Sequence, residues 1–176
     1  PLDPRFEPRI REAIRAARRQ AGKPPPRQGN LLLNGDFESP PAADGKPAGW
    51  THWSPSAKLI KGAGRNGTTC VLLHHDKPIP SDNIRAQAVT LVPGRAYRLT
   101  AWIKRDTPAD KASQHTGLWP HTYAGDNRDK YSRRLSMWIP RSMNKFDWQL
   151  WENTFIATDA EQQVVVWFYC SDAAGD

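Results

Sequence analysis

The chain after residue 28 consists of short runs in which apolar and polar residues alternate. Glycine, proline, asparagine and aspartate separate these runs, and no run after residue 20 has the period of an amphipathic helix. Alternation with a period of two is typical of strands that bury one face, and several such strands indicate a β-sandwich. The pattern predicts an all-β fold with two packed sheets. The expected strands lie near residues 31–38, 57–61, 69–74, 84–91, 95–104, 131–139, 149–157 and 162–170.

Residues 1–28 follow a different pattern. Apolar residues recur there at helical spacing, with arginines between them, at Phe6, Ile10, Ile14 and Ala17. This spacing predicts a basic amphipathic helix over residues 5–20. Three consecutive prolines at 24–26 then predict a stiff, extended linker. We therefore expect an appendage over residues 1–28 and one folded domain over residues 29–176.

Most of the formal net charge of +7 belongs to the appendage. Residues 1–28 hold eight Lys and Arg against three Asp and Glu, whereas residues 29–176 hold seventeen against fifteen. An arginine-rich helix can contact nucleic acid or an anionic membrane, but more often it docks on its own domain or on a neighbouring one. Because no nucleic-acid-binding motif and no interleaving of aromatic and basic residues occur, we do not expect a nucleic-acid partner.

The composition also bears on compartment. No run approaches the roughly eighteen apolar residues of a membrane span, so none is expected. The chain starts at Pro1 without an apolar leader, and we expect a mature or excised piece of a secreted protein, extracellular or periplasmic. Cys70 and Cys170 both fall in expected strands. They either form a disulfide or remain two small buried side chains, and the sequence leaves both options open.

The segment NLLLNGDFE spans residues 30–38, and the pair Gly49-Trp50 ends twelve residues after it. Asn34-Gly35 offers a backbone position that tolerates a positive φ, and Phe37 is expected to return to the core. Glu38 is expected to lie beside Phe37 at the core, where its carboxylate needs a partner such as a cation or backbone N–H groups. This segment resembles the opening strand of the jelly-roll carbohydrate-binding modules of family 4/9.

Further matches to that family follow in the same order. They are Gln87, Val89, Leu91, Pro93-Gly94, Tyr97, Leu99, Trp102 and Lys104, then Trp148 or Trp151 before Thr154-Phe155, then residues 164–168. The resemblance covers about residues 30–170 and implies a jelly-roll β-sandwich that binds carbohydrate. Family members usually close with a strand that carries an aromatic residue and one or two aspartates. Residues 171–176 correspond to the turn before it, so we expect that strand to be missing or supplied from elsewhere, which exposes a sheet edge.

Outward positions of three expected strands combine aromatic rings with planar hydrogen-bond donors, as a sugar-binding surface requires. By alternation they are Arg98 and Trp102, Arg134 and Trp138, and Trp167. Residues 105–130 are expected to form a long, functional loop. Four of its side chains would border the surface: Trp119, His121, Tyr123 and Arg128. The same aromatic residues could instead be covered by loops or by the basic helix.

Two further expectations concern charge and metal. Residues 104–145 hold nine Lys and Arg against four acids, which favours an acidic glycan that bears uronate or sulfate groups. The family resemblance implies a structural Ca²⁺ held by Glu38, loop carbonyls and an aspartate of the closing strand. Without that strand, Asp36 is the nearest alternative carboxylate, although it could merely cap the turn.

Catalysis is not expected. The histidines form no metal-binding motif, no G-x-S-x-G occurs, and none of the eighteen carboxylates is marked as a catalytic pair. We therefore expect a non-catalytic domain that binds a polysaccharide and holds an attached or partner enzyme near it. The alternatives are a structural spacer packed on a neighbouring catalytic domain, and an anion-binding module that contacts acidic glycan or nucleic acid through arginines.

Overall fold

The computed structural model describes residues 29–75, 81–107, 115–125, 130–135, 137–140 and 142–171. The expected N-terminal helix, the linker and Arg128 lie outside these residues. The regular structure of the described part consists of thirteen strands and one 3-10 turn, η1 (Arg65–Gly67). No helix in that part has the length and hydrophobicity of a membrane span. The predicted all-β fold is confirmed.

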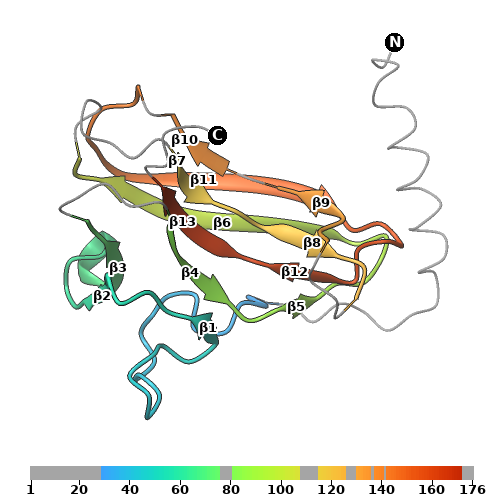
Figure 1. Ribbon diagram of the computed structural model, residues 1–176, viewed down its shortest axis with the longest axis horizontal. Helices are drawn as coiled ribbons and strands as arrows, with labels where there is room; N and C mark the ends of the chain where they lie inside the picture. The colour runs from blue at the N-terminus through green and yellow to red at the C-terminus, as the bar shows by residue number, and fades with distance from the viewer. Residues whose placement is uncertain are drawn as a thin grey trace.

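Nine strands form the front layer of the sandwich in Figure 1. They are β1 (Trp50–His52), β4 (Asp82–Ala86), β5 (Val89–Thr90), β7 (His115–Leu118), β8 (His121–Tyr123), β9 (Arg133–Arg134), β10 (Met137–Ile139), β12 (Gln163–Val165) and β13 (Trp167–Ser171). These strands form two sheets, in the orders β1-β4-β13-β7-β10 and β5-β12-β8-β9. Strands that follow one another in the chain occupy corresponding positions in the two sheets, namely β4 and β5, β13 and β12, β7 and β8, and β10 and β9. Trp119 N–H donates to the Trp167 carbonyl at 2.8 Å and joins the two sheets end to end.

The back layer consists of β6 (Ala96–Arg105) and β11 (Phe146–Ile156), which Figure 1 draws paler, behind the front layer. The two strands pair antiparallel from Arg105 with Phe146 to Ala96 with Ile156. A separate hairpin is formed by β2 (Ala57–Ile60) and β3 (Cys70–Leu73). Within the described part of the chain, the edge of β6 away from β11 pairs with no strand.

Two clusters of apolar side chains fill the space between the layers. The larger one contains Ile84, Ile103, Leu118, Met137 and Ile139, and the smaller one contains Leu91, Leu135, Phe155, Ala157 and Val164. These residues alternate with outward ones along each strand, as the sequence predicts for 95–104, 131–139 and 162–170. The predicted inward positions of all three segments are confirmed.

Residues 31–38 differ from the prediction, because they form a series of turns and no strand. Asn34 and Phe37 have φ of 51° and 60°, in the left-handed region that interrupts an extended strand. The Asn34 side-chain oxygen accepts a hydrogen bond from Ser39 N–H at 3.0 Å, and its carbonyl accepts one from Trp50 Nε1 at 3.3 Å. Phe37 nevertheless packs on the core, with its ring 4.8 Å from that of Trp50.

The glycine of the Gly49-Trp50 pair has a steric cause. Gly49 has a φ of 83°, and a Cβ atom there would lie 2.7 Å from the Leu33 carbonyl oxygen. Only glycine tolerates both the backbone conformation and this approach. Gly49 thereby lets the turn segment lie against the start of β1, where Trp50 is buried.

Residues 105–130 also differ from the prediction, because they are not one long loop. β7 and β8 lie within them, and β7 is central in the front layer, between β13 and β10. Both strands are short and polar, and glycine at 117 and proline at 120 interrupt their alternation. Sequence patterns typical of strands are therefore absent from β7 and β8, although long-range pairing of β7 with β13 and of β8 with β12 makes them strands.

A buried ion pair joins the two layers at one end. Glu161 is 2% exposed, and its carboxylate accepts hydrogen bonds from Thr122 Oγ1 at 2.8 Å and from Thr158 N–H at 2.8 Å. Arg133 pairs with it through Nε at 2.7 Å and Nη2 at 2.8 Å. The same guanidinium donates to the Ile156 carbonyl at the end of β11. Arg133 thus links the front layer to the back layer.

No disulfide joins Cys70 and Cys170, so the cysteines do not cross-link the sandwich. Cys170 is buried on the inward side of β13, and Cys70 is half-buried at the start of β3. Burial raises the pKa of the Cys70 thiol. Of the two options that the sequence leaves open, the structure has two small, buried side chains.

Candidate functional site

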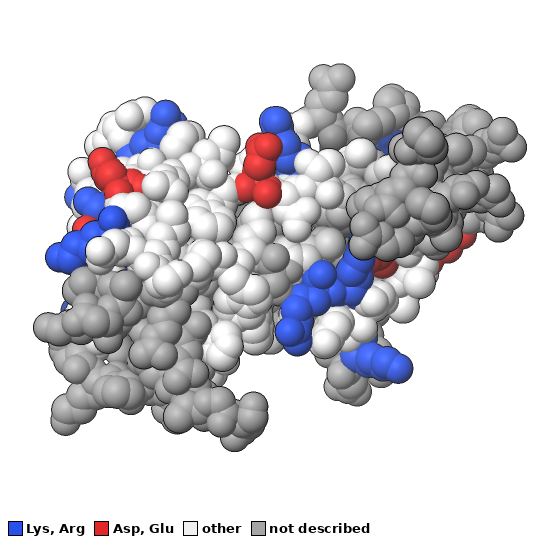
Figure 2. All heavy atoms as spheres, turned by 90° about the horizontal axis from the view of Figure 1, so that it is seen from above, with Lys and Arg blue, Asp and Glu red and all other residues white. Residues whose placement is uncertain are grey.

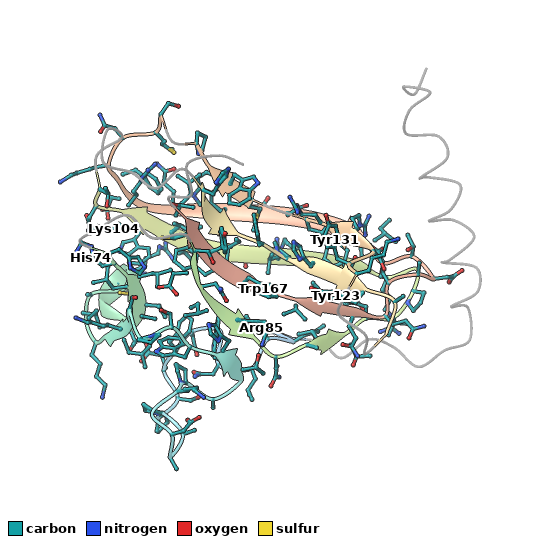
Figure 3. The ribbon with its side chains drawn as sticks, viewed as in Figure 1. His74, Arg85, Lys104, Tyr123, Tyr131 and Trp167 are labelled. Carbon is teal, nitrogen blue, oxygen red and sulfur yellow. The ribbon has the colours of Figure 1, made fainter. Side chains whose placement is uncertain are left out.

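Aromatic side chains gather on the outward side of the front layer. Because the inward residues of β7, β10 and β13 fill the core, the residues between them point outward. Strand pairing then brings outward residues from residues 115–123, 131–138 and 167–169 together. Figure 3 labels four members of this surface, Arg85, Tyr123, Tyr131 and Trp167. We call it the aromatic face and define it by Arg85, His115, Trp119, His121, Tyr123, Tyr131, Arg134, Trp138, Trp167 and Tyr169.

Trp119 lies at the centre of the ring contacts on the aromatic face. Its ring stacks on Tyr169 with 4.2 Å between centroids and 7° between planes. The Trp138 ring meets it edge-on at 4.6 Å and 80°. Because Trp119 and Tyr169 each cover one face of the other ring, the rings stand beside one another on the sheet. A ligand would therefore contact their outer edges and the uncovered faces.

His121 extends this row of rings toward β9. Its ring lies 4.7 Å from Tyr131 and 5.8 Å from Trp119, nearly parallel to both. His121 is 9% exposed, whereas Tyr131 is 43% exposed. Burial lowers the pKa of His121, because it disfavours the charged imidazolium, and the nearby Arg134 guanidinium lowers it further. His121 is thus a neutral hydrogen-bonding group near neutral pH.

Two guanidinium groups lie over rings of the aromatic face. Arg134 is 5.1 Å from the centroid of Trp119 and 5.3 Å from that of Tyr131, and it donates to the Tyr131 hydroxyl at 3.3 Å. Arg85 is 4.9 Å from the centroid of Trp167. Attraction between a cation and the ring quadrupole holds each guanidinium in a preferred orientation.

Four polar atoms of the aromatic face are buried and have no hydrogen-bond partner among the residues that the structure describes. They are Nε1 of Trp119, Nε1 of Trp167, Nε of Arg85 and Nε2 of His121. Indole and guanidinium N–H groups can only donate. An unmade hydrogen bond of this kind costs about 1–3 kcal/mol, so a ligand or ordered water normally supplies the acceptor. This cluster of donors suits a partner that is rich in acceptor oxygens.

Gly117 separates the rings at the middle of the face. Its register partners are Tyr169 on one neighbouring strand and Trp138 on the other. A Cβ atom on Gly117, which has a φ of 155°, would lie 2.3 Å from the Met137 carbonyl oxygen. No side chain can therefore stand between Trp138 and Tyr169, and the backbone of β7 forms the floor between them.

The structure divides the predicted sugar-binding residues between the two outward sides of the sandwich. Trp119, Tyr123, Arg134, Trp138 and Trp167 lie together on the aromatic face. The other two predicted residues, Trp102 and Arg98, point outward from β6 in the back layer. Trp102 is 41% exposed, and the Arg65 guanidinium lies 3.7 Å from its ring centroid. One ligand cannot contact both sides at the same time.

Four residues of the aromatic face were not predicted as site residues, namely Arg85, His115, Tyr131 and Tyr169. His115 lies in β7, whose sequence lacks the pattern of a strand. Tyr169 shares a predicted outward side with Trp167, which is a usable signal. Tyr131 has none, because it precedes β9 and joins the face through its contacts with His121 and Arg134. Arg85 reaches the face because β4 pairs with β13, where Arg85 lies opposite Trp167. Register of this kind cannot be seen in either strand alone.

Glu38 and Asp36, the predicted calcium ligands, make hydrogen bonds within the chain. The Glu38 carboxylate accepts from Thr69 N–H at 2.6 Å and from Thr69 Oγ1 at 3.1 Å, and thereby ties the turn segment to the start of β3. Asp36 accepts from the Glu38 N–H at 3.3 Å, as in a turn cap. Among the described residues, no group of three or more acidic, histidine or cysteine side chains surrounds them. A calcium ion here would therefore also need backbone carbonyl oxygens as ligands.

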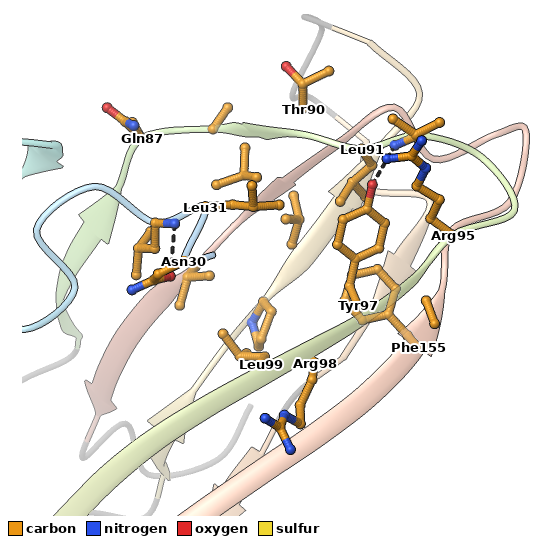
Figure 4. A pocket seen from close by; sticks show the side chains of 18 of the residues that line it. Asn30, Leu31, Gln87, Thr90, Leu91, Arg95, Tyr97, Arg98, Leu99 and Phe155 are labelled. Atoms are coloured by element: carbon orange, nitrogen blue, oxygen red, sulfur yellow. Dashed lines mark hydrogen bonds between the residues drawn. The ribbon is translucent and has the colours of Figure 1, made fainter. Parts of the chain in front are cut away.

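A groove of about 1050 Å³ opens between the edges of the two layers, where β5 faces β6. Figure 4 shows its lining, which includes Leu31, Leu91, Tyr97 and Phe155. Tyr97 Oη accepts a hydrogen bond from Val92 N–H at 2.7 Å and is thus already engaged. The side chains in the groove are mainly those of the core, seen from its open edge. Its apolar walls suit other protein side chains better than sugar hydroxyls.

One protein family matches the chain over residues 29–174. Its sequence model, CBM_4_9, is described as a carbohydrate binding domain. The match covers the whole of the described sandwich and the aromatic face. No curated protein sequence matches the chain.

Solved structures share the fold at low sequence identity. One is named "Family 16 Carbohydrate Binding Module-2", with a TM-score of 0.55, 22% identity, and coverage of 81% of this chain and 92% of that chain. Another is the enzymatically active domain of tailspike protein 4 from bacteriophage CBA120, with a TM-score of 0.52 and 16% identity. The alignment with it covers 83% of this chain but 20% of the tailspike chain. Both similarities concern the sandwich fold.

Proposed function

The chain belongs to this family of carbohydrate-binding domains, and on that premise we propose that its aromatic face binds a polysaccharide without catalysing a reaction on it. The observation that carries the proposal is the continuous row of rings from Tyr131 through His121 and Trp119 to Trp138. The row lies on a sheet, so it is formed before a ligand arrives. Preformed aromatic surfaces of this kind suit sugar rings, which offer C–H groups to the π-systems.

Binding would combine two kinds of contact. Sugar C–H groups would contact Trp138 and Tyr131, while hydroxyl or carboxylate oxygens would accept hydrogen bonds from Arg134 and Arg85. No strand has to move to make these contacts. A surface of this size, without a deep pocket, is expected to bind one chain segment with a Kd between about 1 μM and 1 mM. Tighter attachment to a polymer would come from several modules acting together.

The proposal extends to the role of binding. Attachment to a polysaccharide would hold a covalently attached or partner enzyme close to its substrate, because tethering raises the local concentration. A secreted location, as expected from the sequence, would bring the domain into contact with polysaccharides outside cells. The excess of cations over residues 104–145 favours an acidic polysaccharide.

One observation favours the second candidate function, a spacer that binds no sugar. Trp119 and Tyr169 stack on one another, and His121 is 9% exposed, as in a packed cluster that serves stability. In that case the exposed Tyr131 and Arg134 would contact a neighbouring protein domain. Fold alone does not distinguish these functions, because sandwiches of one family serve both.

Calcium binding stays a prediction. Glu38 would be its principal ligand, and its carboxylate would have to exchange or share the two hydrogen bonds with Thr69. Calcium would then stabilise the contact between the turn segment, at Glu38, and the start of β3, at Thr69. It would take no part in sugar binding. A rise in melting temperature with added Ca²⁺ that EDTA reverses, and that Glu38→Gln abolishes, would support it.

Affinity electrophoresis through gels that contain single polysaccharides tests the proposed function. The panel includes neutral β-glucan, xylan, mannan, alginate and a sulfated galactan. Trp138→Ala is the test variant because its ring is half-buried and lies beside the floor at Gly117. Trp102→Ala, on the other side of the sandwich, is the matched control. Circular dichroism and thermal melting confirm that each variant is folded.

The expected result is that one class of polysaccharide slows migration, and that Trp138→Ala removes this effect while Trp102→Ala keeps it. If the folded wild type migrates unchanged in every gel, the spacer function replaces the proposal. If Trp102→Ala alone abolishes retardation, a polysaccharide is bound, but by the back layer.

A further inference from the structure

The two arginines of the aromatic face lack acidic partners. Neither Arg85 nor Arg134 forms an ion pair with a carboxylate in the described part of the chain. Other cations do have such partners: Lys104 lies 3.7 Å from Asp106 and 3.8 Å from Asp147. Among the described residues, no carboxylate therefore neutralises the charges of Arg85 and Arg134.

Acidic residues are nearly absent from the strands that form the front layer. In their described residues, Asp82 is the only Asp or Glu. Its carboxylate is occupied, because Ser54 Oγ donates to it at 2.6 Å and His75 Nε2 lies 2.8 Å from it. Asp82 also precedes the outward residues Asn83 and Arg85 by one and three positions, which assigns it to the inward side of β4. The outward side of these strands thus carries guanidinium groups without carboxylates.

The nitrogen donors of the face add to this bias, although tyrosine hydroxyls and the amide side chains of Asn83 and Gln163, which lie opposite Tyr169 and Tyr123, can also accept hydrogen bonds. Three of the buried, unpartnered atoms of the face are N–H groups that can only donate, on Trp119, Trp167 and Arg85. Hydroxyl groups of a neutral sugar both donate and accept, and a site for them usually includes carboxylate or amide oxygens. Carboxylate and sulfate groups only accept, and they fit planar guanidinium donors in a bidentate manner.

We infer that the polysaccharide bound by the aromatic face is anionic and that Arg134 and Arg85 bind its carboxylate or sulfate groups; this inference rests on the proposed function. The rings hold both guanidinium groups in orientation before binding, so less side-chain entropy is lost when an anion arrives. Arg134 is exposed and lies over Trp119 and Tyr131, so it is the first contact for a charged group. Arg85, half-buried beside Trp167, would bind a second anionic group along the chain.

Isothermal titration with ligand pairs that share a backbone tests the inference. Polygalacturonate is compared with its fully methyl-esterified form, in which the carboxylates are neutral. A sulfated galactan is compared with the desulfated polymer, which distinguishes sulfate from carboxylate as the group bound. Each titration is made at low and at physiological salt, since charge contacts weaken with ionic strength. The variants are Arg134→Gln and Arg85→Gln, with Arg98→Gln as the control that removes one exposed charge from the back layer.

The expected result is at least about tenfold tighter binding of one charged polymer than of its neutral form, because hydrogen bonds to charged groups are strong. Arg134→Gln should lower that affinity about tenfold and lower the affinity for the neutral form less, because a hydrogen bond to a neutral hydroxyl is weaker than one to a charged group. Arg98→Gln should change neither affinity by more than about twofold.

Three results would overturn the inference. If a neutral polymer binds as tightly as the charged one and Arg134→Gln has no effect, the ligand is not anionic and the inference fails. The proposed function, polysaccharide binding, would still stand. If Arg98→Gln weakens binding as much as Arg134→Gln, general charge attraction replaces the assigned contacts. If the folded wild type binds no polymer of any kind, the proposed function itself fails.

Discussion

The two outward sides of the sandwich are built by the same alternation but differ in chemistry. On the front layer, outward residues of several strands bring together many rings and two guanidinium groups that have no carboxylate partner among the described residues. On the back layer, β6 offers one outward tryptophan, Trp102, which Arg65 covers and Leu150 faces across the ladder. Lys104 there is neutralised by two aspartates. Alternation thus decides which residues face outward, and the number of adjacent strands decides whether they form a surface.

The width of the layers explains this difference. In the front layer, β7 lies between β13 and β10, so an outward residue of β7 has neighbours on both sides. Trp119, which directly follows β7, makes its ring contacts with Tyr169 of β13 and Trp138 of β10. In the back layer, β6 has a strand on one side within the described residues, and Trp102 has one cross-strand neighbour, Leu150. An extended ligand requires outward residues on several adjacent strands, as in the front layer.

The largest expected effect comes from the ion pair that joins the two layers. Glu161→Gln leaves the Arg133 charge without its partner, and we expect the free energy of unfolding to fall by about 3 kcal/mol. Chemical denaturation followed by tryptophan fluorescence measures it. Asp44→Asn, which removes an exposed pair with Lys46, is the control and should have no measurable effect. A Glu161→Gln variant as stable as wild type would show that the layers do not depend on this link.

A smaller effect is expected when the front layer alone is disturbed. Gly117→Ala introduces a Cβ atom against the Met137 carbonyl oxygen, and we expect a loss of about 2 kcal/mol of stability, together with weaker glycan binding. Gly62→Ala is the matched control, because Gly62 also has a positive φ but has no atom near its Cβ position. If both variants lose the same stability, the loss comes from backbone strain at a positive φ and not from the close approach of β7 and β10.

The neutral state of His121 predicts a pH dependence that belongs to the front layer. Its folded pKa is lowered from the ordinary 6.5, so the unfolded chain takes up a proton that the folded chain refuses. Stability should therefore fall as the pH decreases from 7 to about 5. His121→Gln should reduce this slope, which denaturation at several pH values measures. An unchanged slope would assign the pH dependence to other groups.

The smallest effect is expected on the back layer. Arg65→Ala removes the guanidinium from the Trp102 ring, and the stability lost should be below about 1 kcal/mol. Glycan binding should not change, because Trp102 lies on the side opposite the aromatic face. Affinity electrophoresis of the variant checks the second statement. Reduced binding would show that the back layer also contacts the ligand.

Much of the fold could be predicted from local pattern. The inward residues of 95–104 and 162–170 follow from their alternation, and the left-handed backbone near Asn34 follows from the Asn-Gly pair. Asn34 itself adopts it, and the turn that results replaces the expected strand over 31–38. In each case the determining interaction lies within a few residues of sequence.

The composition of the candidate site could be predicted only in part, because it depends on which strands are neighbours. Trp102 and Trp138 look equivalent in sequence, as outward tryptophans beside basic residues, yet they lie on opposite sides of the sandwich. β7 and β8 lack the apolar alternation of strands, so the sequence predicts a loop around Trp119 and His121, which are central in the structure. Their positions depend on the pairing of β7 with β13 and of β8 with β12, both about forty to fifty residues away in sequence.

The free edge of β6 affects how copies of the domain behave toward one another in solution. Within the described residues, one edge of the ten-residue strand β6 has unpaired N–H and C=O groups, and such an edge is a template for any extended chain and invites aggregation. Arg98 is exposed on this strand, so two copies that met edge to edge would bring their like charges toward one another. Charge repulsion therefore keeps the copies apart where no covering element does. This protection acts over about one Debye length and weakens in concentrated salt.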